Sequence, residues 1–343
     1  MKKKLQFLIP QYKETEDIIK PLLDSIEVQQ CVNLKEDIGV IIVNDGTDVH
    51  LSEEFFKRYS FPIEYHLHEH KGVSATRNAC LDYATADYVM FCDADDMFYN
   101  ACGLYIIFRE MEVEGGFDSL VSAFIEESRM PDTKEVIYIN HDMDSTFVHG
   151  KVHRRRFLID NNIRWNPELT IHEDSYFNCL CQKLAKVLKY SETPFYLWKW
   201  RDASVCRHDP KYILKTYNNM LDSNDALIQQ FVGRLMINEA QFYAVGMIYD
   251  AYFTMNKDEW LNQENKEYRY ATEKRFKDYW LKYKNLHDSI PQDIKTQIIM
   301  GIKNRMYMEG MVLETLTFNA QGQGSLVGCR LWGLIESDMT EAT

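Results

Sequence analysis

The sequence predicts an α/β protein in which a mostly parallel sheet, covered by helices on both faces, is followed by a helical C-terminal region. In the first hundred residues, short apolar runs alternate with helix-like stretches, as in parallel strands joined by crossover helices. From about residue 210 onward, apolar residues recur at helical spacing in long segments. The 343 residues suffice for two domains of roughly 150 residues, so we expect one domain over residues 1–208 and another over residues 209–343.

Four apolar strands are expected in the N-terminal region, with the sequences LQFLIP, IGVIIVNDG, IEYHLHE and DYVMFC. Helices are expected between them, including one from Ser74 to Ala84. Three of the strands end in polar clusters, which read IPQYKE, VNDGTD and FCDADD. Ligands bind beyond the carboxyl ends of the strands in such sheets, so we expect these clusters to meet at one edge of the sheet.

Residues 100–205 have a mixed pattern. A helix is predicted from Tyr105 to Glu114, and strands are predicted at FDSLVSAFIEE and VIYIN. A further helix starts near Glu173, and its helical spacing of apolar residues extends to Leu188. We therefore expect this region to add strands to the sheet, and the sequence does not indicate whether they run parallel or antiparallel to the first four.

Composition excludes several classes of function. Lys and Arg number 39 and Asp and Glu 52, and the net charge of −13 argues against broad binding along nucleic-acid backbones. The eight cysteines form no paired CxxC units, so neither a zinc site nor a disulfide framework is indicated. No apolar run reaches the ~18 residues of a membrane-spanning helix, and the apolar stretch before Pro10 is short for a signal peptide. We expect a cytoplasmic protein, either free or attached peripherally to the inner membrane face.

The segment FCDADD carries the clearest chemical signal. An apolar strand delivers Asp93, Asp95 and Asp96 to its end, and alternation in an extended segment would turn Asp93 and Asp95 toward one site. Carboxylates so close repel unless a cation lies beside them, and Mg²⁺ or Mn²⁺ with a diphosphate is the natural occupant. A solvated acidic turn is the alternative for this segment alone.

Two further segments point to a ligand at the same edge. In VIIVNDGT, Asp45 can accept hydrogen bonds from a base or ribose, and Gly46 lets a ligand approach the backbone. In HKGVSATRN, Arg77 lies in the first turn of a helix, where a cation opposes the helix dipole, so it needs an anionic partner such as a nucleotide or the aspartates. The preceding segment EYHLHEH is interpreted as an exposed strand edge that carries His66, His68 and His70.

The ordered motifs IPQYKE, VNDGT, KGVSATRN, FCDADD and IHEDSYF resemble those of family 2 glycosyltransferases, which have the Rossmann-like GT-A fold. The resemblance covers roughly residues 1 to 205. It implies that residues 1–208 form a catalytic domain that binds a nucleotide sugar, usually a uridine one. It also implies metal-dependent transfer of the sugar with inversion at the anomeric carbon.

The resemblance implies roles for individual residues. Those around the nucleotide are Pro10, Tyr12 and Glu14 at the wall of the nucleoside pocket, Asp45 at the base, and Arg77 and Asn78 nearby. Those around the metal and diphosphate are Asp93 near ribose and metal, Asp95 as metal ligand, and Arg201, Ser204 and Arg207 in a closing loop. Apart from the resemblance, His208 is a candidate to complete the metal shell, and a solvent-facing loop histidine is the alternative. The acidic pair Glu173 and Asp174 opens a helix, and Asp174 is the better candidate for the catalytic base.

The expected reaction is transfer of a sugar from a UDP-sugar, with Mn²⁺ or Mg²⁺, to a hydroxyl of a glycan, wall polymer or other glycoconjugate. No motif fixes the sugar or the acceptor. Residues 209–343 are expected to build the acceptor site or the contact of a homodimer. Two alternatives stay open: a phosphohydrolase of the haloacid dehalogenase type, which also places a DxD after an apolar strand, and a non-catalytic protein that binds sugar nucleotides.

Overall fold

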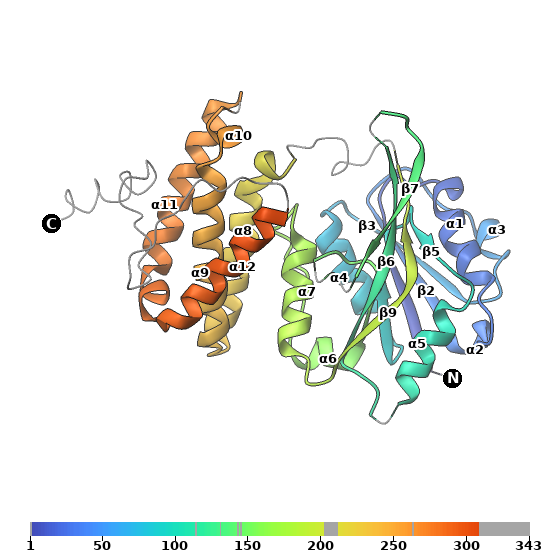
Figure 1. Cartoon of the computed structure of the whole chain (residues 1–343). Coiled ribbons are helices and arrows are strands. Elements are labelled where there is room, and N and C mark those ends of the chain that lie inside the picture. The colour runs from blue at the N-terminus through green and yellow to red at the C-terminus, as the bar shows by residue number, and fades with distance from the viewer. Residues whose placement is uncertain are drawn as a thin grey trace. The chain divides into compact units, whose positions relative to one another are not determined.

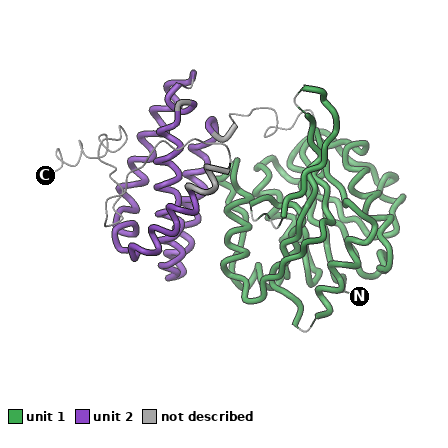
Figure 2. Tube along the Cα trace, in the orientation of Figure 1, with its two compact units in different colours: residues 1–208 green, residues 209–343 purple. Residues whose placement is uncertain are grey.

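The computed structural model describes residues 2–113, 115–130, 132–142, 144, 146–201, 212–262 and 264–308. The chain divides into two compact units, residues 1–208 and residues 209–343 (Figure 2). Each unit has its own arrangement of secondary structure and its own buried core. The functional residues predicted from the sequence all belong to the first unit.

Within the described residues, nine strands form one sheet in the first unit (Figure 1). Their order is β3-β2-β1-β4-β8-β6-β9-β5, and β7 pairs with β6 outside this path. The strands are β1 (Leu5–Gln11), β2 (Ile38–Asp45), β3 (Ile63–His68), β4 (Tyr88–Phe91), β5 (Met97–Phe98), β6 (Ser119–Arg129), β7 (Val136–His141), β8 (Lys151–Arg154) and β9 (Leu188–Trp198).

The first four strands of this order are parallel. Leu5 of β1 is paired with Ile38 of β2 and with Tyr88 of β4, and β3 adds to the free side of β2. Every residue of β2 is buried, which is the expected state of a continuous apolar strand with helices on both faces. Beyond β4 the sheet becomes mixed, because β8 runs antiparallel to β4 and β6 while β9 runs parallel to β6.

Helices cover both faces of the parallel strands, which confirms the predicted fold class. On one face the strands share a core with α1 and α5, and its members include Phe7, Val40, Met90, Ile19, Leu22, Leu104 and Ile107. On the other face α4 packs against β1 and β2, and the ring of Phe91 contacts Phe177 of α7 with 5.5 Å between ring centroids. The helices of this unit are α1 (Glu16–Glu27), α2 (Leu34–Asp37), α3 (Glu53–Phe56), α4 (Val73–Tyr83), α5 (Gly103–Glu112), α6 (Arg155–Asp160) and α7 (Glu173–Leu184).

One boundary differs from the sequence prediction. The helix predicted from Glu173 to Leu188 ends at Leu184, and Leu188 is the first residue of β9. The spacing of apolar residues does not distinguish a short strand from a helical turn, and here the pairing of β9 with β6 decides the conformation.

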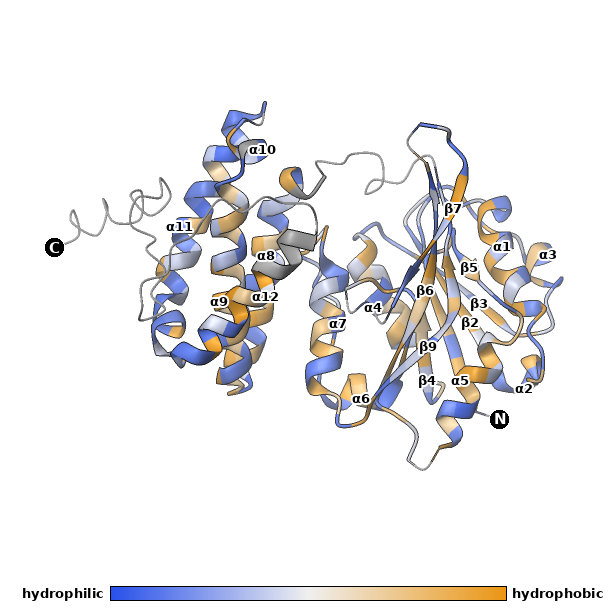
Figure 3. Cartoon of the chain, in the orientation of Figure 1, coloured by the Kyte–Doolittle hydropathy of each residue, from blue (hydrophilic) through white to orange (hydrophobic). Residues whose placement is uncertain are grey.

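The described residues of the second unit form helices α8 (Tyr212–Gly233), α9 (Ile237–Met255), α10 (Asp258–Leu261), α11 (Lys266–Ser289) and α12 (Gln292–Met308). Figure 3 shows that α9 is largely hydrophobic and that α11 carries many hydrophilic residues. Val245, Tyr249 and Phe253 of α9 form a core with Ile298 and Ile302 of α12. This unit confirms the predicted helical C-terminal region. Among the described helices of the chain, none combines the length and the apolar character needed to cross a bilayer.

Candidate active site

A pocket of about 270 Å³ lies where β1, β2 and β4 end. It brings together seven of the residues selected from the sequence, namely Pro10, Tyr12, Glu14, Asp45, Asp93, Asp95 and Arg201. Its other lining residues were not selected, and they are Gln11, His70, Gly72, Val73, Thr76 and Ala94. The three polar clusters therefore meet at one edge of the sheet, as expected for ligand sites in sheets of this kind.

Asp45 lines the pocket, but its carboxylate is engaged by the loop after β3. It accepts hydrogen bonds from the backbone N–H groups of Lys71 at 2.8 Å and Gly72 at 3.0 Å, and its Oδ2 lies 2.9 Å from His70 Nδ1. Gly46 follows with a φ of +71°, and a Cβ there would lie 2.3 Å from the backbone nitrogen of His70. Only glycine fits this close approach, so Gly46 allows the loop after β3 to pack against the end of β2.

His70 is a pocket residue that the sequence analysis missed. Its ring stacks on that of Tyr12, with 4.9 Å between centroids, and the two side chains form an aromatic wall. The interpretation of EYHLHEH as a strand edge holds for His66 and His68, which contact Tyr83. His70 lies two residues beyond the end of β3, where alternation along the strand no longer decides its direction.

The acidic cluster forms a turn, so the expected extended alternation of Asp93 and Asp95 is wrong. The N–H of Asp96 donates to the carbonyl of Asp93 at 3.2 Å, and residues 94 and 95 are the turn. Asp93 and Asp95 still line the same pocket. Asp95 accepts a hydrogen bond from the guanidinium of Arg201 at 3.0 Å, and burial together with Asp93 raises the pKa of Asp95.

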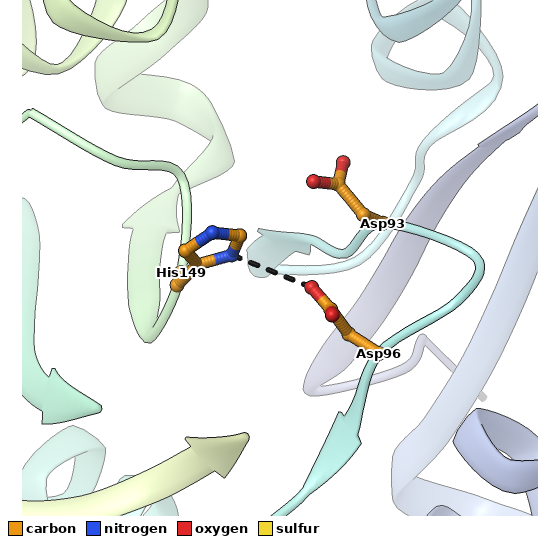
Figure 4. A group of neighbouring side chains, drawn as sticks. All are labelled: Asp93, Asp96 and His149. Atoms are coloured by element: carbon orange, nitrogen blue, oxygen red, sulfur yellow. Dashed lines mark ion pairs between the residues drawn. The ribbon is translucent and has the colours of Figure 1, made fainter. Parts of the chain in front are cut away.

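Asp96 points away from the pocket into the protein. Its carboxylate accepts hydrogen bonds from the hydroxyl of Tyr196 at 2.7 Å and from the N–H of Lys199 at 3.0 Å. Figure 4 shows Asp96 and Asp93 on either side of the space in front of His149, whose Nδ1 lies 3.5 Å from Asp96 Oδ2. One ligand atom from each of these three residues lies within 4.8 Å of the others, which is a candidate metal group.

This group differs from the predicted metal ligands Asp93, Asp95 and His208. His208 lies outside the described residues, as do Ser204 and Arg207. The guanidinium of Arg201 bridges Asp95 and Glu14 at 3.0 and 3.2 Å, so a cation already lies against the predicted ligand Asp95. Carboxylate oxygens suit Mg²⁺ and Mn²⁺, and the pocket acids therefore fit the predicted cation.

Arg77 is the centre of a buried ionic cluster. Its side chain is 4% exposed, and it lies 2.8 Å from Asp93, 3.0 Å from Glu173 and 2.9 Å from Asp174. Burial opposes its charge, but the three carboxylates outweigh burial and raise the pKa of Arg77. The anionic partners expected from its place in α4 are therefore these acids, and Arg77 does not line the pocket.

Asp174 differs from Asp93 in its electrostatics. Burial raises the pKa of Asp174 to about 7, and Glu173 and Asp93 act in the same direction while Arg77 opposes them. For Asp93, burial is outweighed by Arg77 and His149, and its pKa lies below the usual value. Asp174 Oδ2 also accepts a hydrogen bond from the N–H of Val148 at 3.2 Å. A carboxyl group with a pKa near neutrality is suited to accept a proton.

Asn78 is selected from the sequence but does not reach the pocket. Its amide donates to the carbonyl of Trp165 at 2.8 Å and accepts from the N–H of Trp165 at 3.0 Å. The ring of Trp165 lies 4.4 Å from the guanidinium carbon of Arg77. Asn78 therefore fixes the backbone of Trp165, whose ring packs against the guanidinium of Arg77.

The fold matches that of a known GT-A protein. The crystal structure of S. aureus TarS residues 1–349 aligns with a TM-score of 0.62, covering 92% of this chain and 94% of that chain at 15% identity. At this identity the likeness shows the fold alone. TarS has also been crystallised with UDP and with UDP-GlcNAc.

The chain thus has the GT-A fold, with a pocket at its strand ends. The model of glycosyl transferase family 2 matches residues 7–164, which identifies this part of the chain as a glycosyltransferase domain. The resemblance stated from the motifs is thereby confirmed.

Two curated relatives agree with this assignment. Glycosyltransferase GlyA of Streptococcus pneumoniae is 27% identical over 231 residues, which cover 60% of this chain and 32% of GlyA. The prophage-derived glycosyltransferase SunS of Bacillus subtilis is 27% identical over 163 residues, which cover 45% of this chain and 37% of SunS. The chain thus spans about a third of the length of these relatives. The matches support neither the phosphohydrolase nor the non-catalytic alternative.

Proposed function

We propose that this protein transfers a sugar from a UDP-sugar to a hydroxyl of a glycan, wall polymer or other glycoconjugate, with inversion at the anomeric carbon. The observation that carries the proposal is that Arg77 contacts both Asp93, whose pKa is lowered, and Asp174, whose pKa is raised. One guanidinium joins Asp93, which lines the pocket, to Asp174, whose pKa is raised to about 7. A carboxylate of the pocket and the candidate base thus bind the same guanidinium, which would keep the donor and the attacking hydroxyl close together.

The aromatic wall and the known complexes of TarS support a uridine donor. The stacked rings of Tyr12 and His70 offer a flat surface for a nucleobase, and Pro10 and Glu14 line the same pocket. TarS has this fold and binds UDP and UDP-GlcNAc. The choice between glucose, galactose and their N-acetyl forms stays outside this proposal.

Asp93 and Asp95 would hold the divalent cation, Mn²⁺ or Mg²⁺. When bound, the metal neutralises the charge that develops on the diphosphate leaving group. Arg201 supplies a further positive charge in the pocket, and we keep Ser204, Arg207 and His208 as predicted contacts of the diphosphate and the metal. Asp174 accepts the proton of the attacking hydroxyl, and Glu173 holds Arg77 beside it.

The proposal includes where the protein acts and what residues 209–343 do. The cysteines, scattered without paired motifs, support a cytoplasmic location, either free or peripheral at the membrane. Residues 209–343 are proposed to serve acceptor recognition or the contact with a second copy.

The test is release of UDP from UDP-glucose, UDP-galactose, UDP-GlcNAc and UDP-GalNAc, measured with and without simple glycoside acceptors. We expect release from at least one donor with Mn²⁺ or Mg²⁺, and its loss with EDTA or in the variant Asp95→Asn. Asp48→Asn is the matched control, because Asp48 is exposed in the neighbouring NDGTD loop and does not line the pocket. Release that EDTA and Asp95→Asn both leave unchanged would contradict the proposal, as would release of phosphate from p-nitrophenyl phosphate.

A further inference from the structure

Strand β7 lies at an edge of the sheet. Among the described strands it pairs with β6 alone, and the two form a hairpin near the top of the first unit in Figure 1. An edge strand presents backbone N–H and C=O groups to a further strand, and proteins usually protect such an edge with lysine, proline or a bulge. β7 has the sequence VIYINH, which contains neither lysine nor proline, and its register with β6 runs without a bulge. Its edge is therefore suited to pair with another strand.

The register with β6 indicates which backbone groups of β7 face the outer edge. The N–H of Met130 donates to the carbonyl of Glu135 at 2.9 Å, so this pair next to the turn is hydrogen-bonded. Hydrogen-bonded and non-bonded pairs alternate along an antiparallel ladder, so Ile137, Ile139 and His141 direct their backbone groups toward β6. The residues between them direct their backbone groups outward, and these are Val136, Tyr138 and Asn140.

Both faces of β7 carry exposed apolar side chains. Val136 and Tyr138, on one face, are 45% and 60% exposed, and Ile139, on the other face, is 40% exposed. An antiparallel strand in contact with water usually has apolar residues on its packed face and polar residues on the other. A further strand beside β7 would thus cover apolar side chains on both faces as well as pair the backbone groups.

The sequence around β7 is complementary to itself in one antiparallel register. In this register Tyr138 of one copy lies opposite Tyr138 of a second copy. The residues on either side then pair as Ile137 with Ile139, Val136 with Asn140, Glu135 with His141 and Lys134 with Asp142. Two tyrosines meet, isoleucines meet isoleucines, a lysine meets a carboxylate, and a glutamate meets an imidazole. Aromatic, apolar and oppositely charged pairs all stabilise antiparallel strands.

The neighbouring registers are less complementary. Outward backbone groups pair with outward groups, so the next symmetric registers are centred one residue earlier or later. Centring on Ile137 places Glu135 opposite Ile139. Centring on Ile139 places Asp142 opposite Val136. Both put a charged side chain against an apolar one, so the register centred on the tyrosine is favoured.

A second copy of this chain is the occupant that fits this edge. Two identical strands related by a two-fold axis run antiparallel, and each contact between them occurs twice. With the axis at Tyr138, the outward groups of Val136 face those of Asn140 in the second copy, and those of Tyr138 face their own counterparts. All the outward backbone groups of β7 then have partners.

We propose that two copies of this protein associate through β7, paired antiparallel about Tyr138, so that the sheets of the two first units join at this edge. The inference goes beyond the proposed transfer reaction and does not depend on it. It gives a homodimer a contact within residues 1–208.

The test is the mass of the full chain in solution, measured by sedimentation velocity over a series of protein concentrations. We expect a dimer that dissociates on dilution, because one pair of short strands buries little surface. Tyr138→Lys removes the tyrosine pair and places like charges opposite each other at the axis, so it should weaken association by roughly tenfold or more. Leu67→Lys is the matched control, because Leu67 is 60% exposed on β3, another edge strand of the sheet.

A charge exchange tests the register. Lys134→Glu and Asp142→Lys each place like charges opposite one another, so each should weaken the dimer. The double variant restores opposite charges and should recover the affinity of the original chain. Both side chains are exposed and neither lines the pocket, so we expect the fold and UDP binding to persist in all three variants.

The outcomes separate this contact from the proposed function. A monomer at every concentration overturns the β7 contact, and if that monomer binds UDP the donor proposal stands. A dimer that folded Tyr138→Lys leaves at full affinity also overturns the contact. Single charge variants that weaken the dimer without recovery in the double variant overturn the register. If Tyr138→Lys does not fold, the charge exchange decides between these results.

Discussion

Asp174→Asn is expected to lower the rate of sugar transfer by about 10²–10⁴-fold, the usual contribution of a general base, while the affinity for UDP stays unchanged. The amide keeps the shape of the side chain but cannot accept the proton of the attacking hydroxyl. UDP binding should persist, because Asp174 lies beyond Arg77 and does not line the nucleotide pocket. Initial rates and calorimetric titration of UDP measure the two quantities separately.

The pKa of Asp174 adds a pH dependence to this prediction. Because burial raises that pKa to about 7, kcat/KM should fall as the pH drops below that value and the base becomes protonated. The folded protein also holds this proton more tightly than the unfolded chain, whose aspartates have a pKa near ~3.9. The contribution of Asp174 to the free energy of unfolding is therefore full at low pH and is lost as the pH rises toward 7.

Glu173→Gln is the matched control for the assignment of the base. Glu173 lies beside Asp174 at the start of α7 and also bonds to Arg77, at 3.0 Å. We expect the Gln variant to keep most of the transfer rate, with the fall in kcat/KM shifted to lower pH, because the charge of Glu173 helps to raise the pKa of Asp174. If Glu173→Gln were inactive and Asp174→Asn active, the base would be Glu173.

Arg77→Met is expected to reduce the free energy of unfolding by about 3–5 kcal/mol, the cost of breaking a buried ion pair by removing one partner. The variant leaves three carboxylates close together around an apolar side chain, with no cation to balance them. Some will take up protons, so the loss should be smaller at pH 5 than at pH 8. Urea denaturation at both pH values measures the difference.

Arg156→Gln is the control for the effect of removing an arginine. Its ion pair with Asp160 has side chains that are 86% and 58% exposed, and an exposed pair contributes only about 0–1 kcal/mol. Arg77→Lys should recover part of the stability, since it restores a charge without the planar fork that reaches three acids. Equal free energies of unfolding for Arg77→Met and Arg156→Gln would show that the ion pairs of Arg77 do not stabilise the fold.

The parallel half of the sheet could be predicted because its signals are local. Continuous apolar strands such as β2 are buried on both faces, and the carboxyl ends of parallel strands meet at one edge. The mixed half depends on pairings that the sequence does not display. β9 pairs with β6 although some sixty residues separate them, and this contact converts the end of a predicted helix into a strand.

For the candidate site too, the sequence predicts some of the residues but not how the chain brings them together. The acids at 93 and 95 were selected from their place after a strand, but the turn that directs them was not, since alternation assumes an extended backbone. His149 approaches Asp96 through the loop before β8, and no spacing in the sequence joins them. His70 had a usable signal, because it directly precedes the KG segment that opens α4.

We propose that the pocket at the ends of β1, β2 and β4 is a metal-dependent site for a UDP-sugar. The most direct measurement is calorimetric titration with UDP, GDP, CDP and TDP, each with Mn²⁺ and with EDTA. We expect UDP to bind tightest with Mn²⁺, and EDTA or Asp95→Asn to weaken this binding. If no nucleotide binds, or if UDP binds equally well with EDTA and in Asp95→Asn, the pocket is not a metal-dependent site for a UDP-sugar.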